Sequence, residues 1–328
     1  MDAERKRFVA EPFELKGDKT HTDYIIRLAD ALDKLSDQQG RLDIILKKSR
    51  RGQPITYTVR TTFSNGAVGK GFVDSALLSV KTSHEIRQYD ATYSHPKSII
   101  LHFPCDQTPH LQDIASLMKR PDNEILKLSE LQKDKGIIAF AFTINIGSEE
   151  ITMWGSLSSS KVLDPAHFFL FSSKEGRFEA ISEQYIVAIP KRVDAISNPS
   201  SVYIFNQIKF ETIFDFKDGF IANIESNKNK LNLVLKEPDK LIEWCSKHLD
   251  STRKLFSAIA NFDQRKLTPD IAKKIAKLYK LNIRFDSDGL IDITTSSLND
   301  IVKLLDDDLV KSAQNPRLKY ITHGKTPA

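Results

Sequence analysis

The chain has 328 residues, a formal net charge of +5 at pH 7, and apolar and charged fractions of 40% and 28%. These values exclude a disordered or fibrous protein and allow one large domain or two. Its two cysteines, Cys105 and Cys245, are too few for a disulfide framework and lack metal-site spacing. The densest apolar run, residues 137–142, is far shorter than the roughly 18–20 residues of a spanning helix. No apolar run typical of a secretory signal follows the basic residues 5–7. We therefore expect a cytoplasmic protein that reaches a membrane only through a partner.

The N-terminal part of the sequence predicts a helix followed by strands. An apolar stripe from Ile25 to Leu35 predicts the helix, which Thr22 is expected to cap and Gly40 to end. Alternating or continuous short apolar runs between turn residues indicate strands. These expected strands span residues 42–47, 55–63, 72–80 and 98–103.

A glycine-rich segment, residues 66–71, contains Lys70 and invites comparison with a phosphate-binding loop. It lacks the four-residue spacer and the Ser/Thr after the lysine that this motif uses to hold magnesium. We interpret the segment as a hairpin turn.

Two helical segments, residues 111–118 and 123–131, are expected on either side of Pro121. This break and the lysine-rich residues 133–135 predict a domain boundary. The chain would then consist of an N-terminal α/β domain, residues 1–132, as a candidate for DNA or partner contact, and an α+β domain, residues 133–328.

The second half of the sequence predicts strands first and helices afterwards. Expected strands span residues 136–146, 151–154, 167–171, 184–189 and 202–205. Expected helices span residues 209–216, 219–231, 238–262 (with an internal break), 269–279 and 298–310. Residues 286–289 indicate a hairpin turn between two short strands. The order of elements predicts an α+β fold with mixed or antiparallel sheets in the N-terminal and middle parts and a helix-rich C-terminal third.

The chain carries no recognisable catalytic motif, and we expect a protein that is not an enzyme and uses no cofactor. Its eight histidines are scattered without convincing ligand spacing. Asp306, Asp307 and Asp308 are consecutive, so on a helix their carboxylates would point in different directions and could not all meet one metal. A metal-dependent nuclease that assembles Glu211 and Asp307 from distant elements stays open as an alternative.

Positive charge is concentrated in two places that suit a phosphate backbone. Residues 228–284 hold fourteen Lys/Arg against six Asp/Glu. Within them, the helix at 269–279 is expected to bury Ile271, Ile275, Leu278 and Tyr279 and to expose its lysines. Contacts of lysine and arginine with phosphates give affinity without reading sequence. The candidate DNA-binding residues are Lys47, Lys48, Arg50 and Arg51 in a turn between strands, and Arg265, Lys266, Lys273, Lys274, Lys277 and Lys280 on and before the helix. A scaffold whose basic faces dock an acidic protein is a further alternative.

Several segments of the second half resemble one bacterial domain family of initially unassigned function. The resemblance covers roughly residues 136–325. Its most specific positions are Phe210, Glu211, Asp307 and Ser312. The segments that carry it are FFLF at 168–171, IVAIPKRVDAI at 186–196, VYIFNQIKFETIF at 202–214 and LDDDLVKS at 305–312.

The best-known member of that family is the soluble B subunit of the Kiwa anti-phage system. The resemblance therefore implies a cytosolic defence effector that binds DNA and blocks phage replication and transcription. It further implies a small transmembrane partner subunit that senses infection and recruits the effector to the inner face of the membrane. We expect a homodimer.

Overall fold

The computed structural model describes residues 15–35, 39–48, 55–64, 66–93, 95–96, 98–120, 136–158, 162–163, 171–174, 177–180, 186–307, 309–311 and 319–321. For strand residues within 162–187 and 310–321 the backbone alone is described. The described residues form two compact units. The first unit lies within residues 1–88 and 97–206, and the second within residues 89–96 and 207–328.

An eight-stranded sheet forms the centre of the first unit. Its strands are β1 (Gly40–Lys48), β2 (Thr56–Ser64), β3 (Glu85–Gln88), β4 (Ile99–Pro104), β5 (Ile137–Ile146), β6 (Glu149–Ser156), β11 (Ala195–Ser197) and β12 (Ser201–Ile204). They are ordered β2-β1-β5-β6-β11-β12-β4-β3. All neighbours are antiparallel except β3 and β4, which are parallel.

Four short strands pair outside this sheet. They are β7 (Val162–Leu163) with β10 (Ile186–Val187), and β8 (Phe171–Lys174) with β9 (Arg177–Ala180). The strand expected at residues 184–189 is confirmed in part as β10. Most of the strand expected at 167–171 lies outside the described residues.

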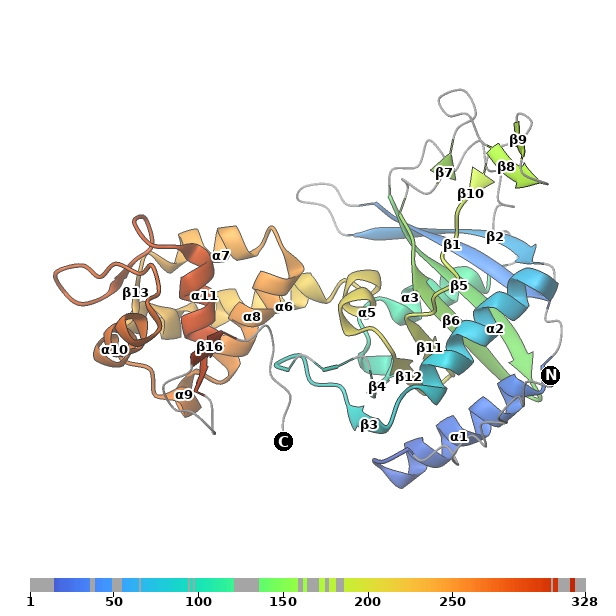
Figure 1. Cartoon of the computed structure of the whole chain (residues 1–328), viewed down its shortest axis with the longest axis horizontal. Helices are drawn as coiled ribbons and strands as arrows, with labels where there is room; N and C mark the ends of the chain where they lie inside the picture. Colours follow the sequence, from blue (N-terminus) through green and yellow to red (C-terminus); the bar gives the residue numbers. More distant parts are fainter. Residues whose placement is uncertain are drawn as a thin grey trace, which may run out of the picture. The chain divides into compact units, whose positions relative to one another are not determined.

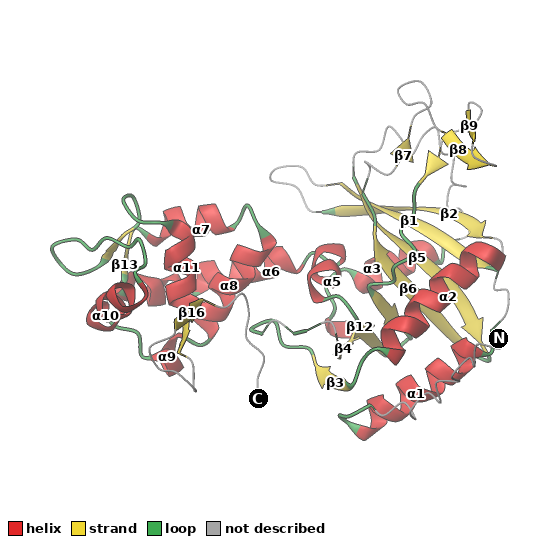
Figure 2. Ribbon diagram, in the orientation of Figure 1, coloured by secondary structure: helices red, strands yellow, loops and turns green. Residues whose placement is uncertain are grey.

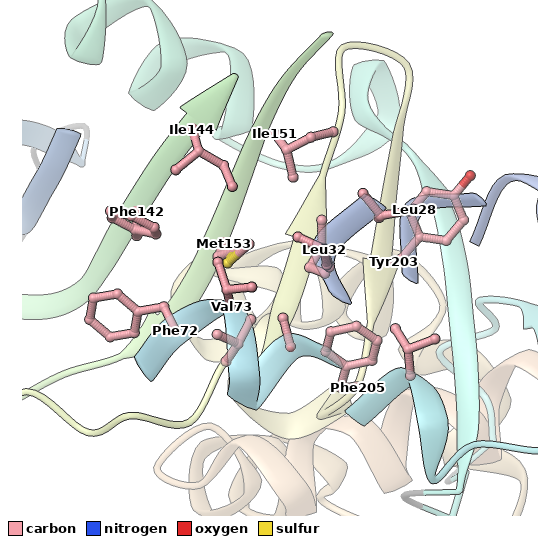
Figure 3. Packing of buried hydrophobic residues seen from close by; sticks show 14 of the residues in the cluster. Leu28, Leu32, Phe72, Val73, Phe142, Ile144, Ile151, Met153, Tyr203 and Phe205 are labelled. Atoms are coloured by element: carbon pink, nitrogen blue, oxygen red, sulfur yellow. The ribbon is translucent and has the colours of Figure 1, made fainter. Parts of the chain in front are cut away.

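Helices cover both faces of the large sheet (Figure 2). They are α1 (Lys19–Asp33), α2 (Gly66–Lys81) and α3 (Leu111–Met118), with a 3-10 turn, η1, at Cys105–Gln107. Helices α1 and α2 pack on one face, where Phe72 lies 5.2 Å from Phe142 between ring centroids. Figure 3 shows Phe72 and Val73 of α2 beside Phe142 and Met153 of the sheet. The core of the first unit is therefore a layer of large apolar side chains between two helices and one sheet face.

Helix α2 corrects the prediction for residues 66–80. The glycine-rich segment starts this helix instead of forming a hairpin turn, and the strand expected at 72–80 is its continuation. Phe72, Val73, Ala76 and Val80 are buried, and their spacing of one, four and eight residues is helical. The strand was predicted from a short apolar run after a glycine-rich segment, a pattern that does not distinguish a strand from a buried helix.

The cap of α1 was also wrongly predicted. Asp18 caps the helix, with Oδ1 accepting from the N–H of Thr20 at 2.9 Å, whereas Thr22 lies inside it. Gly40 does not end α1, because the helix ends at Asp33 and Gly40 begins β1. Aspartate is an equally good cap, so capping chemistry alone could not distinguish the two starts.

The domain boundary expected after residue 132 does not correspond to the two units. Strand β1 pairs with β5 along Arg41–Leu46, so strands from both sides of that boundary share one sheet. Residues 121–135, on which the boundary was placed, lie outside the described residues, as does the helix expected at 123–131. Pairing between strands distant in sequence leaves no local mark at which a boundary could be recognised.

The second unit is mainly helical, which confirms the α+β class with a helix-rich C-terminal part (Figure 1). Its helices are α5 (Gln207–Ile213), α6 (Phe216–Ser226), α7 (Pro238–Cys245), α8 (Leu249–Ala260), α9 (Phe262–Arg265), α10 (Pro269–Tyr279) and α11 (Leu298–Asp306), with the 3-10 segment η3 (Lys228–Leu233). Its strands are β13 (Leu235–Lys236), β14 (Ile291–Asp292), β15 (Leu309–Lys311) and β16 (Lys319–Ile321).

Two local predictions in the second unit are confirmed, the second of them only for the turn and not for a full hairpin. The break expected within residues 238–262 is confirmed, because α7 ends at Cys245 and α8 begins at Leu249. The turn at 286–289 is also confirmed, with Asp286 Oδ1 accepting from the N–H groups of Asp288 and Leu290. Its flanks form one antiparallel bridge rather than a full hairpin, and β14 pairs in parallel with β13.

No helix within the described part of the chain is both long and apolar enough to cross a membrane.

Replacing Phe142 by alanine is expected to lower the free energy of unfolding of the first unit by about 3–5 kcal/mol, because the ring is fully buried and its loss leaves a cavity. The chain has two tryptophans, Trp154 in the first unit and Trp244 in the second. Denaturant unfolding followed by Trp154 fluorescence in a Trp244→Phe background measures the change.

The matched control for this prediction is Phe63→Ala. The Phe63 side chain belongs to the same sheet but is 79% exposed, and we expect a change within about 0.5 kcal/mol. Equal effects of the two substitutions would contradict the packing described for this face.

Candidate functional site

Helix α10 carries the larger of the two basic clusters, and its bounds are those predicted from the sequence. Thr268 caps it, with Oγ1 accepting from the N–H of Ile271 at 3.4 Å, and Pro269 and Asp270 occupy the first turn. At the other end Lys280 adopts a positive φ of 55°. The helix is therefore held by its own start and stop signals.

The α10 lysines face solvent. Lys273, Lys274, Lys277 and Lys280 are all exposed. The ammonium of Lys273 lies 5.7 Å from the centroid of the Phe285 ring, close enough for a cation–π contact. The result is a row of positive charges along the outer side of one helix, which we call the lysine face of α10.

The buried side of α10 differs from the prediction. Ala272 and Ala276 face the core, and Ile275 packs partly against it. Ile271 and Leu278, which were expected in the core, are 39% and 38% exposed. Alanines allow a helix to approach its neighbours closely, so the larger residues are displaced to the flank of the lysine face.

Lys266 is exposed and ends α9 with a positive φ of 49°. The neighbouring candidate, Arg265, has a structural role. Its guanidinium donates to the Leu305 carbonyl, and its second terminal nitrogen lies 3.2 Å from Asp306 Oδ1. These bonds direct the charge of Arg265 towards the end of α11.

The second basic cluster belongs to the first unit and is described only in part. Lys47 and Lys48 end β1, where they pair in register with Tyr57 and Thr56 of β2. Lys48 is exposed, while Lys47 is half-buried. Arg50 and Arg51 lie outside the described residues, so the expected cluster at this turn stays a prediction.

The family-like residue Glu211 lies in a buried polar cluster of the second unit. Its carboxylate is fully buried, and Oε1 accepts from the Tyr89 hydroxyl and from Gln207 Nε2, each at 3.0 Å. The Arg253 guanidinium approaches Oε2 at 3.8 Å, which is an ion pair too long for a hydrogen bond. Two polar contacts and one buried cation thus surround this carboxylate.

Residues 89–96 contribute backbone acceptors to the same cluster. Arg253 and Gln207 both donate to the Tyr93 carbonyl, each at 3.0 Å. The side-chain oxygen of Gln207 accepts from the His95 N–H at 3.2 Å. The segment is therefore connected to α5 and α8 by polar side chains.

A neighbouring set of bonds joins α8 to the end of α11. The Ser257 hydroxyl lies 3.0 Å from the Thr92 carbonyl and 2.8 Å from Asp306 Oδ1. Asp306 in turn pairs with Arg265. Asp306 therefore joins α8 and α9 to the end of α11.

The other positions singled out with Glu211 have ordinary structural surroundings. Phe210 is fully buried and its ring centroid lies 5.2 Å from those of Phe214 and Phe216. Asp307 is exposed and ends α11 with a positive φ of 57°. Ser312 lies outside the described residues. Over the part of the chain that the structure describes, no three His, Cys, Asp or Glu residues cluster as they would to hold a metal ion.

No local sequence pattern indicates the partners of Glu211. Tyr89 and Tyr93 come from a segment more than a hundred residues away, and Arg253 stands among many basic residues. One indication was available in principle. Arg253 lies on the same side of α8 as Phe256 and Ser257, three and four residues further along, and Phe256 packs against the core, so a charged residue on this side needs a partner.

A protein-family model described as Kiwa protein KwaB-like matches residues 134–315, more than half of the chain. The match covers β5, β6, β11 and β12 of the large sheet and most of the helical unit, including α10 and Glu211. No curated protein and no solved structure matches the chain.

Replacing Arg253 by methionine is expected to lower the free energy of unfolding of the second unit by about 3–5 kcal/mol, because it leaves a buried carboxylate without its cation. Trp244 fluorescence in a Trp154→Phe background reports on that unit. Lys247→Met is the control, because the Lys247 side chain is 62% exposed in its pair with Glu243. An Arg253→Met protein as stable as this control would contradict the role assigned to the buried pair.

Stability should also depend on pH through Glu211. Burial raises the pKa of this carboxyl above its ordinary value of 4.5, against the opposing effect of Arg253. The folded protein then binds the proton more tightly than the unfolded chain does. The contribution of the protonated Glu211 carboxyl to the free energy of unfolding is fully present below about pH 4.5. It is lost as the pH rises through the raised pKa.

Glu211→Gln removes this titration. The unfolding free energy of the wild type relative to this variant should fall as the pH is raised from about 4.5 to neutrality. The measurement is denaturant unfolding across that range with the Trp244 probe. A difference that is constant or that grows with pH would show that Arg253 outweighs burial at this carboxyl.

Proposed function

The chain belongs to the Kiwa protein KwaB-like family, which associates it with Kiwa anti-phage defence, and from that premise we propose that it is a non-enzymatic effector that binds DNA through phosphate contacts. In this proposal it acts with a membrane-embedded partner subunit that recruits it to the inner face of the membrane. As a homodimer it would present two copies of the DNA-binding surface and block replication or transcription of phage DNA.

The lysine face of α10 is the observation that supports DNA binding. Three exposed lysines of the helix and Lys280 at its C-cap would neutralise phosphates and release their counterions. Lysine is a flexible point charge, so these contacts would position the duplex without distinguishing bases. The expected affinity is therefore sequence-independent and falls steeply with salt.

The rigidity of the helix adds to this support. The lysines stand on a capped helix whose inner side packs into the core of the second unit. The helix fixes the spacing of the backbone positions that carry these side chains, so less ordering of the chain is needed when the lysines contact a row of phosphates.

Replacing Lys274 and Lys277 together by glutamine is expected to weaken binding of a random-sequence DNA duplex and to lower the slope of log affinity against log salt by about 2, one phosphate contact for each lysine. Fluorescence anisotropy across a salt series measures both quantities. The effect should be the same for unrelated duplex sequences, because phosphate contacts carry no base information.

The matched control replaces Lys240 and Lys247 by glutamine. These lysines are exposed in the same unit but form ion pairs with Glu237 and Glu243. The slope should then stay close to that of the wild type. The proposal fails if both double variants lower the slope equally, or if the wild type does not bind duplex DNA at low salt.

A protein-docking role is the second candidate, and the exposed Ile271 and Leu278 favour it. Two large apolar side chains beside the lysines would not contribute to phosphate contacts. A partner protein with acidic and apolar residues would bury them. Loss of partner binding with unchanged DNA binding on charge reversal of Lys273 and Lys277 would favour this role.

A further inference from the structure

The two faces of the large sheet are built from different kinds of residue. Towards α1 and α2, β5 presents Phe140 and Phe142 and β6 presents Met153, all members of the first unit's core. Side chains alternate along a strand, so Ala141 and Thr152 belong to the opposite face. That face therefore mixes small and hydroxyl-bearing residues with one large buried ring, Trp154, which is opposite Ala141.

Strand register places four polar residues of this face in one row. Arg41 of β1 is opposite Thr143 of β5, Thr143 is opposite Thr152 of β6, and Thr152 is opposite Ser197 of β11. Thr143, Thr152 and Ser197 are each only 7% exposed. Thr143 Oγ1 and Thr152 Oγ1 lie 3.1 Å apart and hydrogen-bond each other, while Arg41 at the end of the row is partly exposed. Polar residues buried on a sheet face are more informative than buried apolar ones.

A pocket of about 440 Å³ opens above this row, between the sheet and α3. Thr152, Trp154 and Ser197 form its buried floor, and Ala115 and Met118 of α3 line its wall. This volume lies within the range of small-molecule sites, which combine apolar walls with a few placed polar groups.

The floor offers hydrogen-bond donors. Ser197 Oγ accepts from Trp154 Nε1 at 2.8 Å, so its own proton is left to donate. Arg41 binds the buried Asp43 through Nε at 2.8 Å, a bond that does not use its terminal nitrogens. A carboxylate or carbonyl oxygen is the group that fits such a floor.

The charges around the pocket are balanced. Lys119 lies 3.6 Å from Glu150 at the opening, and Asp106 also lines it with Arg41. Two cations and two carboxylates do not favour a polyanion such as a nucleotide phosphate chain. They suit a ligand that carries both charges itself.

We propose that this pocket binds a small zwitterionic molecule with an apolar side chain, of which a free apolar amino acid is the simplest example. Its carboxylate faces Arg41 and Ser197, its ammonium group faces Glu150, and its side chain lies against Met118. This inference is independent of DNA binding, since every residue it uses belongs to the first unit.

The test is isothermal titration of the full-length protein with L-methionine and L-phenylalanine. Their N-acetyl and amide derivatives each lack one charge, and we expect either change to weaken binding about tenfold or more, the effect of losing a hydrogen bond to a charged group. Inorganic pyrophosphate should not bind at the pocket.

Two variants locate the site. Ala115→Phe fills the pocket from α3 and should abolish amino-acid binding, whereas Ser116→Phe adds the same ring on an exposed position of that helix and should leave binding unchanged. Glu150→Gln alters only the opening, and it should weaken the amino acids but not their N-acetyl derivatives.

The proposal is overturned if neither amino acid binds at millimolar concentration. It is equally overturned if Ala115→Phe and Ser116→Phe bind alike, or if pyrophosphate binds in place of the amino acids. Circular dichroism of each variant separates loss of binding from loss of the fold.

Discussion

The second unit depends on the buried carboxylate of Glu211, which needs a partner of opposite charge. Glu211 is fully buried beside aromatic rings, and a carboxylate there is tolerable only while Arg253 and two hydrogen-bond donors surround it. Because those groups come from α5, α8 and residues 89–96, satisfying one side chain brings three parts of the chain together. Ser257 extends the same polar connection to α11. The core that receives the inner side of α10 is thereby assembled around a polar centre.

This arrangement separates two of the residues on which the sequence resemblance was based from the surface proposed to bind DNA. Phe210 and Glu211 are buried and organise the fold, whereas the lysines of α10 and the exposed Ile271 lie on the outside. A buried ion pair contributes little net stability compared with apolar packing, but it penalises any packing that separates the charges. These two buried residues therefore serve the architecture of the second unit, and DNA binding has to be argued from the surface.

Features that depend on residues close together in the sequence were predicted more accurately than features that depend on distant segments. Helix α10 was predicted with its bounds because its cap, its first proline and its periodicity are all local. The strand-to-helix passage that starts at residue 202 was predicted for the same reason, but the helix ends at Ile213 and α6 begins at Phe216, so the predicted end at 216 was wrong. Helix α2 was missed because glycines and valines outweighed a helical spacing of buried residues. The partners of Glu211 and the polar row from Arg41 to Ser197 arise from contacts between distant segments, which one sequence does not reveal.

The placement of residues 89–96 has a consequence for how the protein is made. This segment lies between two strands of the first unit but completes the second, so the chain passes from one unit to the other at residues 88/89, 96/97 and 206/207. During synthesis, Thr92 and Tyr93 leave the ribosome long before α8, which supplies the side chains that bond their carbonyls. Neither unit is a continuous stretch of the sequence, so the second unit cannot fold completely until its later segment has been synthesised. A fragment of residues 207–328 would lack residues 89–96 of its own unit, whereas a fragment of residues 1–206 would carry that segment without the helices that it bonds to.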